Sequence, residues 1–230
     1  MSLRTIPIIA YHRVGELKGD HVPTVSPESF EIQLRYLHRH GYRTLELNDV
    51  AAEAQQPRRT VVLTFDDGYD GTAVNAAPLL RRYGFQATVF VTPAEVGLPG
   101  FMTWEQITAI AGDGFTIGSH TMHHQYLPLL SRDRVQQELA ESKQVLEARL
   151  GRAVEWLSYP VGGYTPEVQA AARSVGYSGA CTTNRGLTKR MWDPFALRRI
   201  KMTDRDRHPL LLWAKLSGYY DCFRQLEQPS

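Results

Sequence analysis

The stretch TVVLTFDDGYD, residues 60–70, joins an apolar run to two adjacent carboxylates. A strand that ends in polar residues recurs along the chain and indicates its fold. The apolar run predicts a buried strand over 60–65. Asp66 and Asp67 follow it at once, and like charges so close repel each other unless a partner neutralises them. On a regular strand the two side chains would face opposite ways, so we expect Gly68 to allow the sharp turn that points both into one site.

Short apolar runs alternate with helical patterns on both sides of this stretch. Strands are predicted over 5–11, 42–47, 60–65, 87–92, 115–119, 154–159, 178–183 and 196–201. Helices are predicted from Ser26 to Gly41, from Asn48, up to Tyr83, from Thr103, over 131–150, from Thr165 to Gly176 and over 209–217. This alternation indicates a parallel sheet with helices outside it, and no glycine-rich nucleotide loop follows the first strand. We therefore predict an α/β fold, a distorted or incomplete (β/α) barrel of seven to eight units, since a full barrel usually needs about 250 residues.

The composition is that of an ordinary globular protein, and it excludes several classes of function. The 230 residues carry a formal net charge of +2, which gives no reason to expect nucleic acid as a partner. No apolar run approaches the roughly 18 residues that a membrane span needs. We expect one domain over 1–230, because no linker or internal repeat divides the chain. The opening residues have too short an apolar core for a signal peptide, so the sequence as it stands predicts a cytoplasmic protein, whereas a trimmed leader would imply export.

Six polar residues and one proline stand at the ends of four of the predicted strands. In chain order these residues are Tyr11, His12, Asp66, Asp67, His120, Tyr159 and Pro160. In a parallel barrel all the carboxyl ends of the strands lie on one face, where such enzymes build their active sites. The sequence therefore predicts that these residues lie close together.

A divalent metal ion would account for this cluster. His120 and His124 are four residues apart, so on a helical turn both imidazoles lie on one side. Two imidazoles and one carboxylate make a three-ligand site with an open position, which is the arrangement of catalytic zinc. One aspartate would bind the cation, and the other would be left free to take a proton from a water.

Each pattern also has a structural interpretation when it is taken alone. An Asp-Asp-Gly turn is common in loops, and His123 would pair with His120 almost as well as His124 does. Spacing therefore leaves open which histidines and which aspartate would bind the metal. The joint occurrence of these residues at the ends of separate strands favours the metal site.

Several segments resemble a known family, and the similarity covers nearly the whole chain. TFDDGY (64–69) and SHTMHH (119–124) resemble the first two signature motifs of the polysaccharide deacetylases, the NodB-like carbohydrate esterases of family four. YPVGGYT (159–165) resembles the third motif of that family. IPIIAYHRV (6–14) resembles the opening strand of the subgroup that acts on exopolysaccharide or poly-N-acetylglucosamine.

The resemblance implies a role for individual motif residues. It makes Asp66 the general base and leaves His123 out of the site. The implied metal ligands are Asp67, His120 and His124. The implied metal is zinc, with Co²⁺ or another divalent ion as the alternative, and the backbone N–H of Val161 is the implied donor to the oxyanion.

The chain departs from the family pattern where the third motif usually begins. An arginine that braces the catalytic aspartate normally stands there, whereas this chain has Ser158. Arg198 or Arg199, at the start of a late predicted strand, could replace that arginine.

The second departure concerns the histidine that usually acts as general acid late in the chain. His208 precedes its apolar run instead of following it, so a surface position at a helix start is favoured for it. His12 is another candidate proton donor, and without either of them Asp66 itself would return the proton. The expected substrate contacts are His12, Tyr69, Tyr159 and Pro160.

Together these features predict a metal-dependent hydrolase that removes N-acetyl groups from the sugars of a polysaccharide or cell-surface glycan. Removal of O-acetyl groups is the rival hydrolase function, because ester cleavage depends less on protonation of the leaving group. A catalytically weak carbohydrate-binding relative is the alternative from another class. The retained Asp66 argues against it, and the missing arginine and histidine argue for it.

Overall fold

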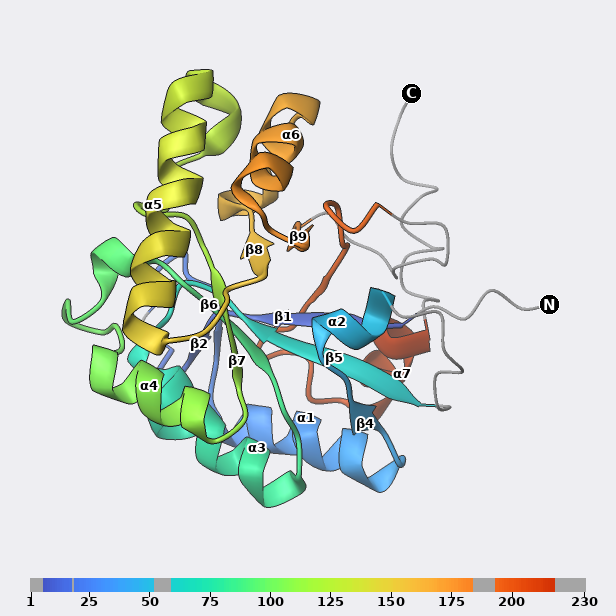
Figure 1. Cartoon of the computed structure of the whole chain (residues 1–230). Coiled ribbons are helices and arrows are strands. Elements are labelled where there is room, and N and C mark those ends of the chain that lie inside the picture. The colour runs from blue at the N-terminus through green and yellow to red at the C-terminus, as the bar shows by residue number, and fades with distance from the viewer. Residues whose placement is uncertain (1–5, 18, 52–58, 184–192, 218–230) are drawn as a thin grey trace.

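In the computed structural model, short parallel strands alternate with helices along the chain (Figure 1). The structure describes residues 6–17, 19–51, 59–183 and 193–217. The strands are β1 (Ile8–Tyr11), β2 (Arg13–Val14), β3 (Thr24–Val25), β4 (Arg43–Thr44), β5 (Thr60–Phe65), β6 (Thr88–Val91), β7 (Thr116–Ser119), β8 (Trp156–Ser158), β9 (Gly179–Cys181) and β10 (Ile200–Lys201). The helices are α1 (Pro27–Arg39), α2 (Leu47–Ala51), α3 (Ala77–Tyr83), α4 (Trp104–Gly112), α5 (Arg132–Leu150), α6 (Pro166–Val175) and α7 (Pro209–Ser217).

The principal sheet is parallel and runs in the order β10-β1-β5-β6-β7-β8-β9, with β4 paired to β5 beside this path. Its two ends approach each other, because Leu197 pairs with Cys181 of β9 while Ile200 of β10 pairs with Ile9 of β1. Figure 1 shows α1, α3 and α4 next to one another in the lower part of the view and α5 and α6 in its upper part, so the helices follow the curved sheet around its outside. The prediction of an α/β fold, a distorted barrel of seven to eight units, is confirmed.

Short polar residues begin four helices where the sequence indicated. Each accepts a hydrogen bond through its side-chain oxygen from the backbone N–H three residues further on, and these residues are Ser26, Thr103, Ser131 and Thr165. Such a cap satisfies one of the unpaired N–H groups of the first turn and is worth about 1 kcal/mol. Left-handed glycines end three helices, and these are Gly84, Gly151 and Gly176.

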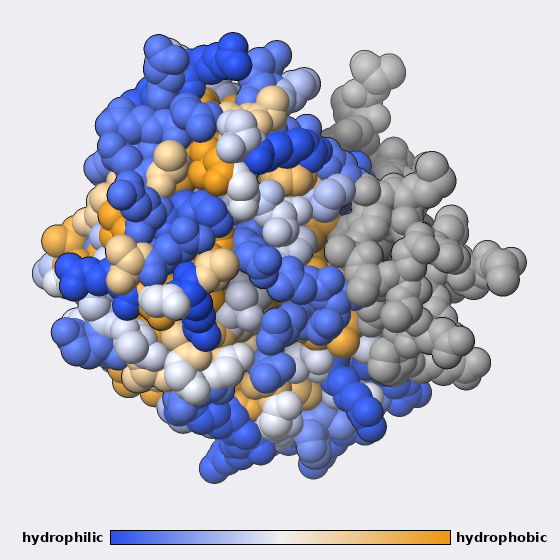
Figure 2. All heavy atoms as spheres, in the orientation of Figure 1, coloured by the Kyte–Doolittle hydropathy of each residue, from blue (hydrophilic) through white to orange (hydrophobic). Residues whose placement is uncertain are grey.

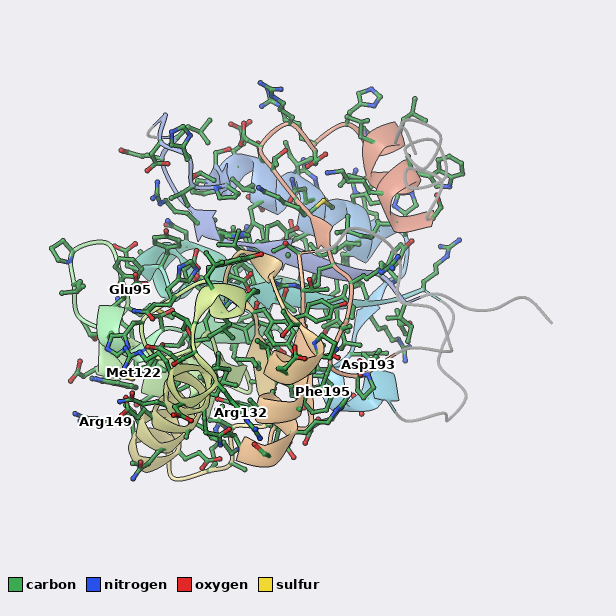
Figure 3. The ribbon with its side chains drawn as sticks, turned by 90° about the horizontal axis from the view of Figure 1, so that it is seen from above. Glu95, Met122, Arg132, Arg149, Asp193 and Phe195 are labelled. Carbon is green, nitrogen blue, oxygen red and sulfur yellow. The ribbon has the colours of Figure 1, made fainter. Side chains whose placement is uncertain are left out.

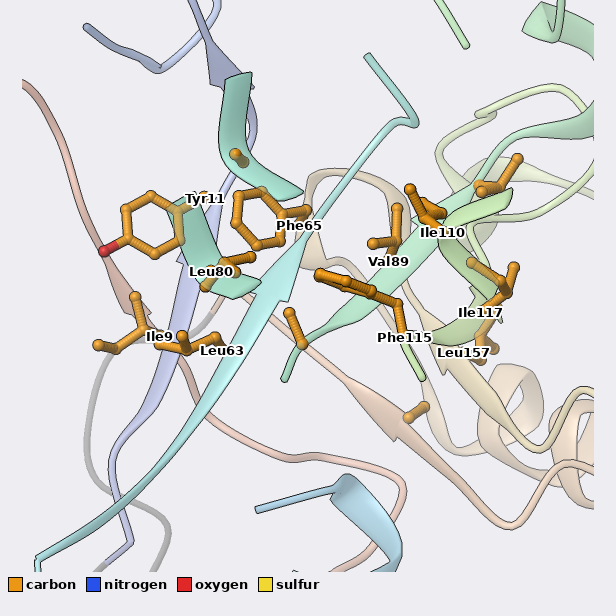
Figure 4. Close-up of a cluster of buried hydrophobic side chains, with 14 of the residues drawn as sticks. Ile9, Tyr11, Leu63, Phe65, Leu80, Val89, Ile110, Phe115, Ile117 and Leu157 are labelled. Atoms are coloured by element: carbon orange, nitrogen blue, oxygen red, sulfur yellow. The ribbon is translucent and has the colours of Figure 1, made fainter. Parts of the chain in front are cut away.

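The core fills the space between the sheet and its covering helices (Figure 4). All six residues of β5 are buried, as expected for a strand of a parallel sheet that is covered on both faces. Tyr11, at the end of β1, belongs to this core: its ring stacks on Phe65 with centroids 5.2 Å apart. Its hydroxyl donates a hydrogen bond to Oε1 of Gln33 at 2.9 Å.

The chain between β5 and α3 is less regular than the sequence suggested. A π-helical turn over Thr72–Ala76 precedes α3, and turns of this kind occur frequently at functional sites. Gly71, just before it, is required for space, because a Cβ there would lie 2.1 Å from the carbonyl oxygen of Val14. The two-residue strands β2 and β3 pair separately from the principal sheet and were too short to show a sequence pattern.

Hydrophilic residues cover most of the face seen in Figure 2, with apolar side chains scattered among them. None of the helices in the described ranges has the length and apolar character needed to cross a membrane.

Candidate metal centre and active site

The predicted site residues follow the carboxyl ends of neighbouring strands, and several of them are in contact. His12 follows β1, and its Nε2 lies 4.0 Å from Oδ2 of Asp66, which follows β5. Oδ1 of Asp67 lies 3.2 Å from Nε2 of His120 and also 3.2 Å from Nε2 of His124, both after β7. The parallel sheet therefore joins residues that are more than fifty positions apart in the sequence.

The two adjacent aspartates point to different partners because the backbone turns at the second of them. Asp67 has a φ of +71° and Gly68 a φ of +82°, so two successive residues are left-handed. The sequence predicts a turn at Gly68, and the structure has this turn but begins it one residue earlier, at Asp67. The left-handed conformation costs a non-glycine residue about 1–2 kcal/mol. Strain of this kind is typically kept where a side chain must be aimed at a site.

Asp67, His120 and His124 offer three donor atoms that lie within 4.8 Å of one another. In a tetrahedral zinc site, ligand atoms about 2.1 Å from the metal are about 3.4 Å apart. The two separations of 3.2 Å from Oδ1 of Asp67 are close to this value. The three residues therefore have the chemistry and spacing to hold a small divalent cation.

The hydrogen bond of His120 supports the same interpretation. Its Nδ1 lies 2.7 Å from the carbonyl oxygen of Ser158, which can only accept, so Nδ1 carries the proton. In the neutral ring Nε2 then has a lone pair, and this lone pair faces a carboxylate oxygen of Asp67. Two acceptors that face each other at this distance require a proton or a cation between them. A carbonyl that fixes the tautomer in this way is the usual partner of a metal-binding histidine.

His123 is turned away from this cluster. Its Nδ1 lies 2.8 Å from Oε1 of Glu138, and its backbone N–H donates to Oε2 of the same carboxylate at 2.9 Å. The structure thus separates the two histidines that spacing could not distinguish: His124 faces Asp67, whereas His123 faces α5.

Asp66 is held by Arg199, one of the two arginines proposed as replacements. Nη1 of Arg199 donates to Oδ1 and Nη2 to Oδ2, both at 2.7 Å, and both side chains are buried. Burial opposes ionisation of Asp66, but the charge and hydrogen bonds of Arg199, together with the charges of His120 and His12, outweigh it and lower the pKa of this carboxyl below its ordinary value. Arg198, the other candidate, is exposed.

Ser158 is part of this arrangement. Its hydroxyl accepts a hydrogen bond from Nη2 of Arg199 at 2.9 Å, and Ser158 is fully buried. Thr64 and Thr182 accept two further hydrogen bonds from the same guanidinium. A small residue at position 158 thus leaves room for an arginine that arrives from the other end of the sheet.

The loop after β8 is strained and lies close to the backbone of a neighbouring segment. Val161 has a φ of +56° and its side chain is 69% exposed. At Gly162 the φ is +75°, and a Cβ there would lie 2.4 Å from the backbone nitrogen of Thr183. Val161, whose backbone N–H is the expected oxyanion donor, is therefore exposed, and this role remains a prediction.

Tyr159 and Pro160 differ from the expectation that their side chains contact substrate. Both are buried, and the Tyr159 hydroxyl donates to the carbonyl oxygen of Phe195 at 3.1 Å. The Tyr159 ring stacks on Tyr164, with centroids 5.3 Å apart. A fully buried ring offers no face to a sugar, so the structure gives Tyr159 a packing role beneath the loop.

Tyr69 is half-buried beside the site. Its ring stacks on Phe101 with centroids 4.9 Å apart, and the guanidinium of Arg13 lies 4.9 Å from the same ring. These contacts fix the ring next to Gly68 and Asp67. Its expected contact with substrate remains a prediction.

His208 lies outside this group of residues. It is exposed at the start of α7, where its Nδ1 accepts a hydrogen bond from the backbone N–H of Leu210 at 3.3 Å. The expectation of a surface position at a helix start is confirmed.

One carboxylate near the site had no signal in the sequence. Glu95 lies in the turn after β6, where the N–H of Ala94 donates to the carbonyl oxygen of Met122 at 3.1 Å. Figure 3 shows Glu95 and Met122 close together. Burial raises the pKa of Glu95, and His124 opposes this effect. Glu95 belongs to no motif, so only the packing of this turn against residues 119–124, which include His120 and His124, reveals it.

Comparison with known proteins gives the same family in sequence and in structure. Residues 53–180 match the family model described as Polysaccharide deacetylase. The Bacillus subtilis (strain 168) protein YxkH, which is named for this family, is 33% identical over 202 residues, or 86% of this chain and 71% of that protein. The Streptococcus pyogenes deacetylase PplD, solved in complex with acetate, matches with a TM-score of 0.87 at 26% identity, over 94% of this chain and 99% of that one.

A more distant relative carries a more specific name. The Staphylococcus aureus (strain MRSA252) poly-β-1,6-N-acetyl-D-glucosamine N-deacetylase is 25% identical over 176 residues, which is 67% of this chain. The match covers 61% of that enzyme, so this chain spans less than two thirds of its length.

Proposed function

Because this chain belongs to the polysaccharide deacetylase family, we propose that it is a divalent-metal-dependent hydrolase that removes N-acetyl groups from the sugars of a polysaccharide. The observation that carries the proposal is the separation of the two aspartates. Asp67 faces two imidazoles, whereas Asp66 is held apart by Arg199. A protein that only binds metal or sugar does not need the second carboxylate, but a hydrolase uses it as a base.

Asp67, His120 and His124 would hold the cation. We assign zinc, with Co²⁺ as the alternative, because two imidazoles and a carboxylate with an open position form the donor set of catalytic zinc. When bound, the ion polarises the acetyl carbonyl and activates a water. The carbonyl of Ser158 keeps the proton of His120 on Nδ1 and so leaves Nε2 free for this role.

Asp66 takes the proton from the attacking water. Each of its oxygens accepts one N–H from Arg199 and keeps a second acceptor site free. Arg199 therefore holds the base ionised and fixes its direction. The backbone N–H of Val161 donates to the oxyanion of the tetrahedral intermediate, and one such donor is worth about 3 kcal/mol of barrier.

His12 is the candidate that protonates the leaving amine. Its Nε2 lies 4.0 Å from Oδ2 of Asp66 and its side chain is 16% exposed, so it reaches both the base and the opening of the site. Return of the proton by Asp66 itself is the alternative. His12→Gln should lower kcat strongly on the amide substrate if His12 is the acid, and it should leave kcat nearly unchanged if Asp66 returns the proton.

The substrate class is inferred from the relatives and from what is exposed near the site. The Staphylococcus aureus relative is named for poly-β-1,6-N-acetyl-D-glucosamine, which supports a polymer of N-acetylglucosamine here. His12, Tyr69 and the exposed Val161 are the residues that we expect to contact the sugar. Pro160 and Tyr159 are buried, so they would support the loop that carries Val161 without contacting the sugar themselves.

The deciding experiment measures acetate release by the protein loaded with one equivalent of zinc. N-acetylglucosamine oligomers and acetylated xylan are offered separately, and we expect release from the oligomers. Asp66→Asn should keep its zinc and lose release by about 10²- to 10⁴-fold, the range for a general base. Asp70→Asn is the matched control, because Asp70 is an exposed carboxylate in the same stretch.

Each alternative function predicts a different result in this assay. Release from xylan alone would identify an O-acetyl esterase. Zinc binding without release from either substrate would identify a carbohydrate-binding relative. Full activity of Asp66→Asn would remove its assignment as the base.

A further inference from the structure

α5 carries buried polar side chains on the face that packs against the metal-ligand loop, residues 119–124. Glu138 and Ser142 are both fully buried, and they lie among the apolar residues Val135, Leu139 and Leu146. Residues four apart project from the same face of a helix. A buried carboxylate is costly unless it is paired and hydrogen-bonded, so its partners indicate why it is there.

Glu138 makes three polar contacts, and two of them are with His123. Oε2 accepts the backbone N–H of His123 at 2.9 Å, and Oε1 lies 2.8 Å from Nδ1 of the same residue. Oε1 also lies 2.8 Å from Nη2 of Arg134, one turn earlier on α5. The carboxylate therefore holds both the backbone and the ring of the residue that precedes the ligand His124.

Ser142 holds the other end of the loop. Its hydroxyl lies 2.7 Å from the hydroxyl of Ser119, and that oxygen accepts the backbone N–H of Thr121 at 3.1 Å. Ser119 and Thr121 flank the ligand His120. α5 thus anchors the loop next to each of the two histidines that face Asp67.

The loop requires such support because its backbone is strained. Thr121 has a φ of +66° and His124 a φ of +54°, and neither is glycine. At about 1–2 kcal/mol for each left-handed residue, an unsupported loop would relax and turn the imidazoles elsewhere.

We propose that Glu138 is a positioning residue that sets the geometry of the metal site through His123, so that the third histidine of the loop acts as an anchor and not as a ligand. This inference rests on the proposed metal site. Because Glu138 holds both the backbone N–H and the ring of His123, that ring faces α5 and not Asp67, so His123 does not compete with His124 for the cation. Glu138 thus helps to determine which residues bind the metal, although α5 itself contributes no ligand.

The test measures metal binding, which does not depend on deacetylase activity. Zinc affinity is obtained by competition with a chromophoric chelator, and the Co²⁺-loaded protein gives a visible spectrum that reports ligand geometry. We expect Glu138→Ala to weaken zinc binding at least tenfold, at the lower end of the range for partners of metal ligands, and to change the cobalt spectrum. Glu138→Gln should recover part of the loss, because its amide oxygen can still accept the N–H of His123. The matched control is Glu141→Gln on the same helix, whose carboxylate bonds to Gln137 and should leave both readouts unchanged.

A folded Glu138→Ala protein with the wild-type zinc affinity and cobalt spectrum would overturn the proposal. If that variant does not fold, His123→Asn carries the same test, because the His123 ring is 41% exposed and its loss should be tolerated. Wild-type metal binding by His123→Asn would then overturn the proposal. Absence of acetate release from the wild-type protein would refute the proposed function and leave this result unaffected.

Discussion

Replacement of Arg199 by methionine removes the only cation that contacts Asp66 at hydrogen-bond distance in the described part of the chain. The substitution keeps a long side chain in the same space but leaves the Asp66 carboxylate buried and without a counter-charge. Thr64, Ser158 and Thr182 lose hydrogen bonds at the same time. We expect Arg199→Met to be strongly destabilising.

The expected size of this effect follows from the burial of both partners, which are 0% and 1% exposed. Breaking a buried ion pair by removing one partner costs about 3–5 kcal/mol. In an Asp66→Asn background the same arginine substitution should cost about 1–2 kcal/mol, because no buried charge is left behind. The double-mutant cycle should therefore give a coupling of about 2–3 kcal/mol.

The loss of stability in Arg199→Met should depend on pH. Arg199 lowers the pKa of Asp66 below its ordinary value, so the pair stabilises the fold above the pKa of an unfolded aspartate, about 3.9. This stabilisation is lost as the pH falls through the lower folded-state pKa. The difference between wild type and Arg199→Met should thus be complete at pH 7 and should shrink below about pH 4.

Urea unfolding of the metal-free proteins measures these differences. With a slope of about 3 kcal/mol per molar urea, the midpoint of Arg199→Met should fall by about 1–1.7 M. Arg198→Met serves as the control, because Arg198 is the exposed neighbour and a surface substitution usually changes stability by less than about 0.5 kcal/mol. Equal midpoints for the two variants, or a coupling near zero, would refute the assignment of Arg199 as the brace of Asp66.

Two further predictions concern the strained loop after β8 and a buried thiol beside it. Gly162→Ala should cost about 2–5 kcal/mol in thermal or urea unfolding, because it adds a clash with the backbone of Thr183 to the strain of a φ of +75°. Gly41→Ala, where φ is +70° but the space is open, should cost only about 1–2 kcal/mol, and equal costs would contradict the clash. Burial raises the pKa of the Cys181 thiol to about 12, so in a Cys222→Ser background we expect no reaction with a disulfide reagent at pH 8 until the protein unfolds. Rapid reaction of the native protein would show that this thiol is accessible.

Most of the fold could be predicted because its signals are local. The capping residues, the terminating glycines and the apolar runs of Thr60–Phe65 and Pro209–Ser217 each lie within the element that they define. The predictions were less accurate where an element depends on a contact elsewhere. β4 and β10 are two residues long, and their pairing with β5 and β1 could not be read from their own residues.

The residues of the candidate site could also be predicted only in part. The residues of the first two motifs could be identified from their place at strand ends and from a family resemblance. The burial of Tyr159 could not be predicted from the sequence. It results from contacts with Phe195, which is distant in the sequence, and with Tyr164, which follows an irregular loop. Glu138 was also missed, since a single acid in a long polar helix gives no signal until its inward face is known.

By itself the sequence determined that two carboxylates and a group of histidines would meet at the carboxyl ends of parallel strands. Only the tertiary structure decided which partner each of them has. Asp66 pairs with an arginine 133 residues away. His123 contacts Glu138 on α5, whereas His124 faces Asp67. Strand ends and residue spacings are properties of short segments. The partner of a charged side chain is set by the low-dielectric interior in which the folded chain places it, because there an unpaired charge costs several kcal/mol and the nearest complementary group must satisfy it.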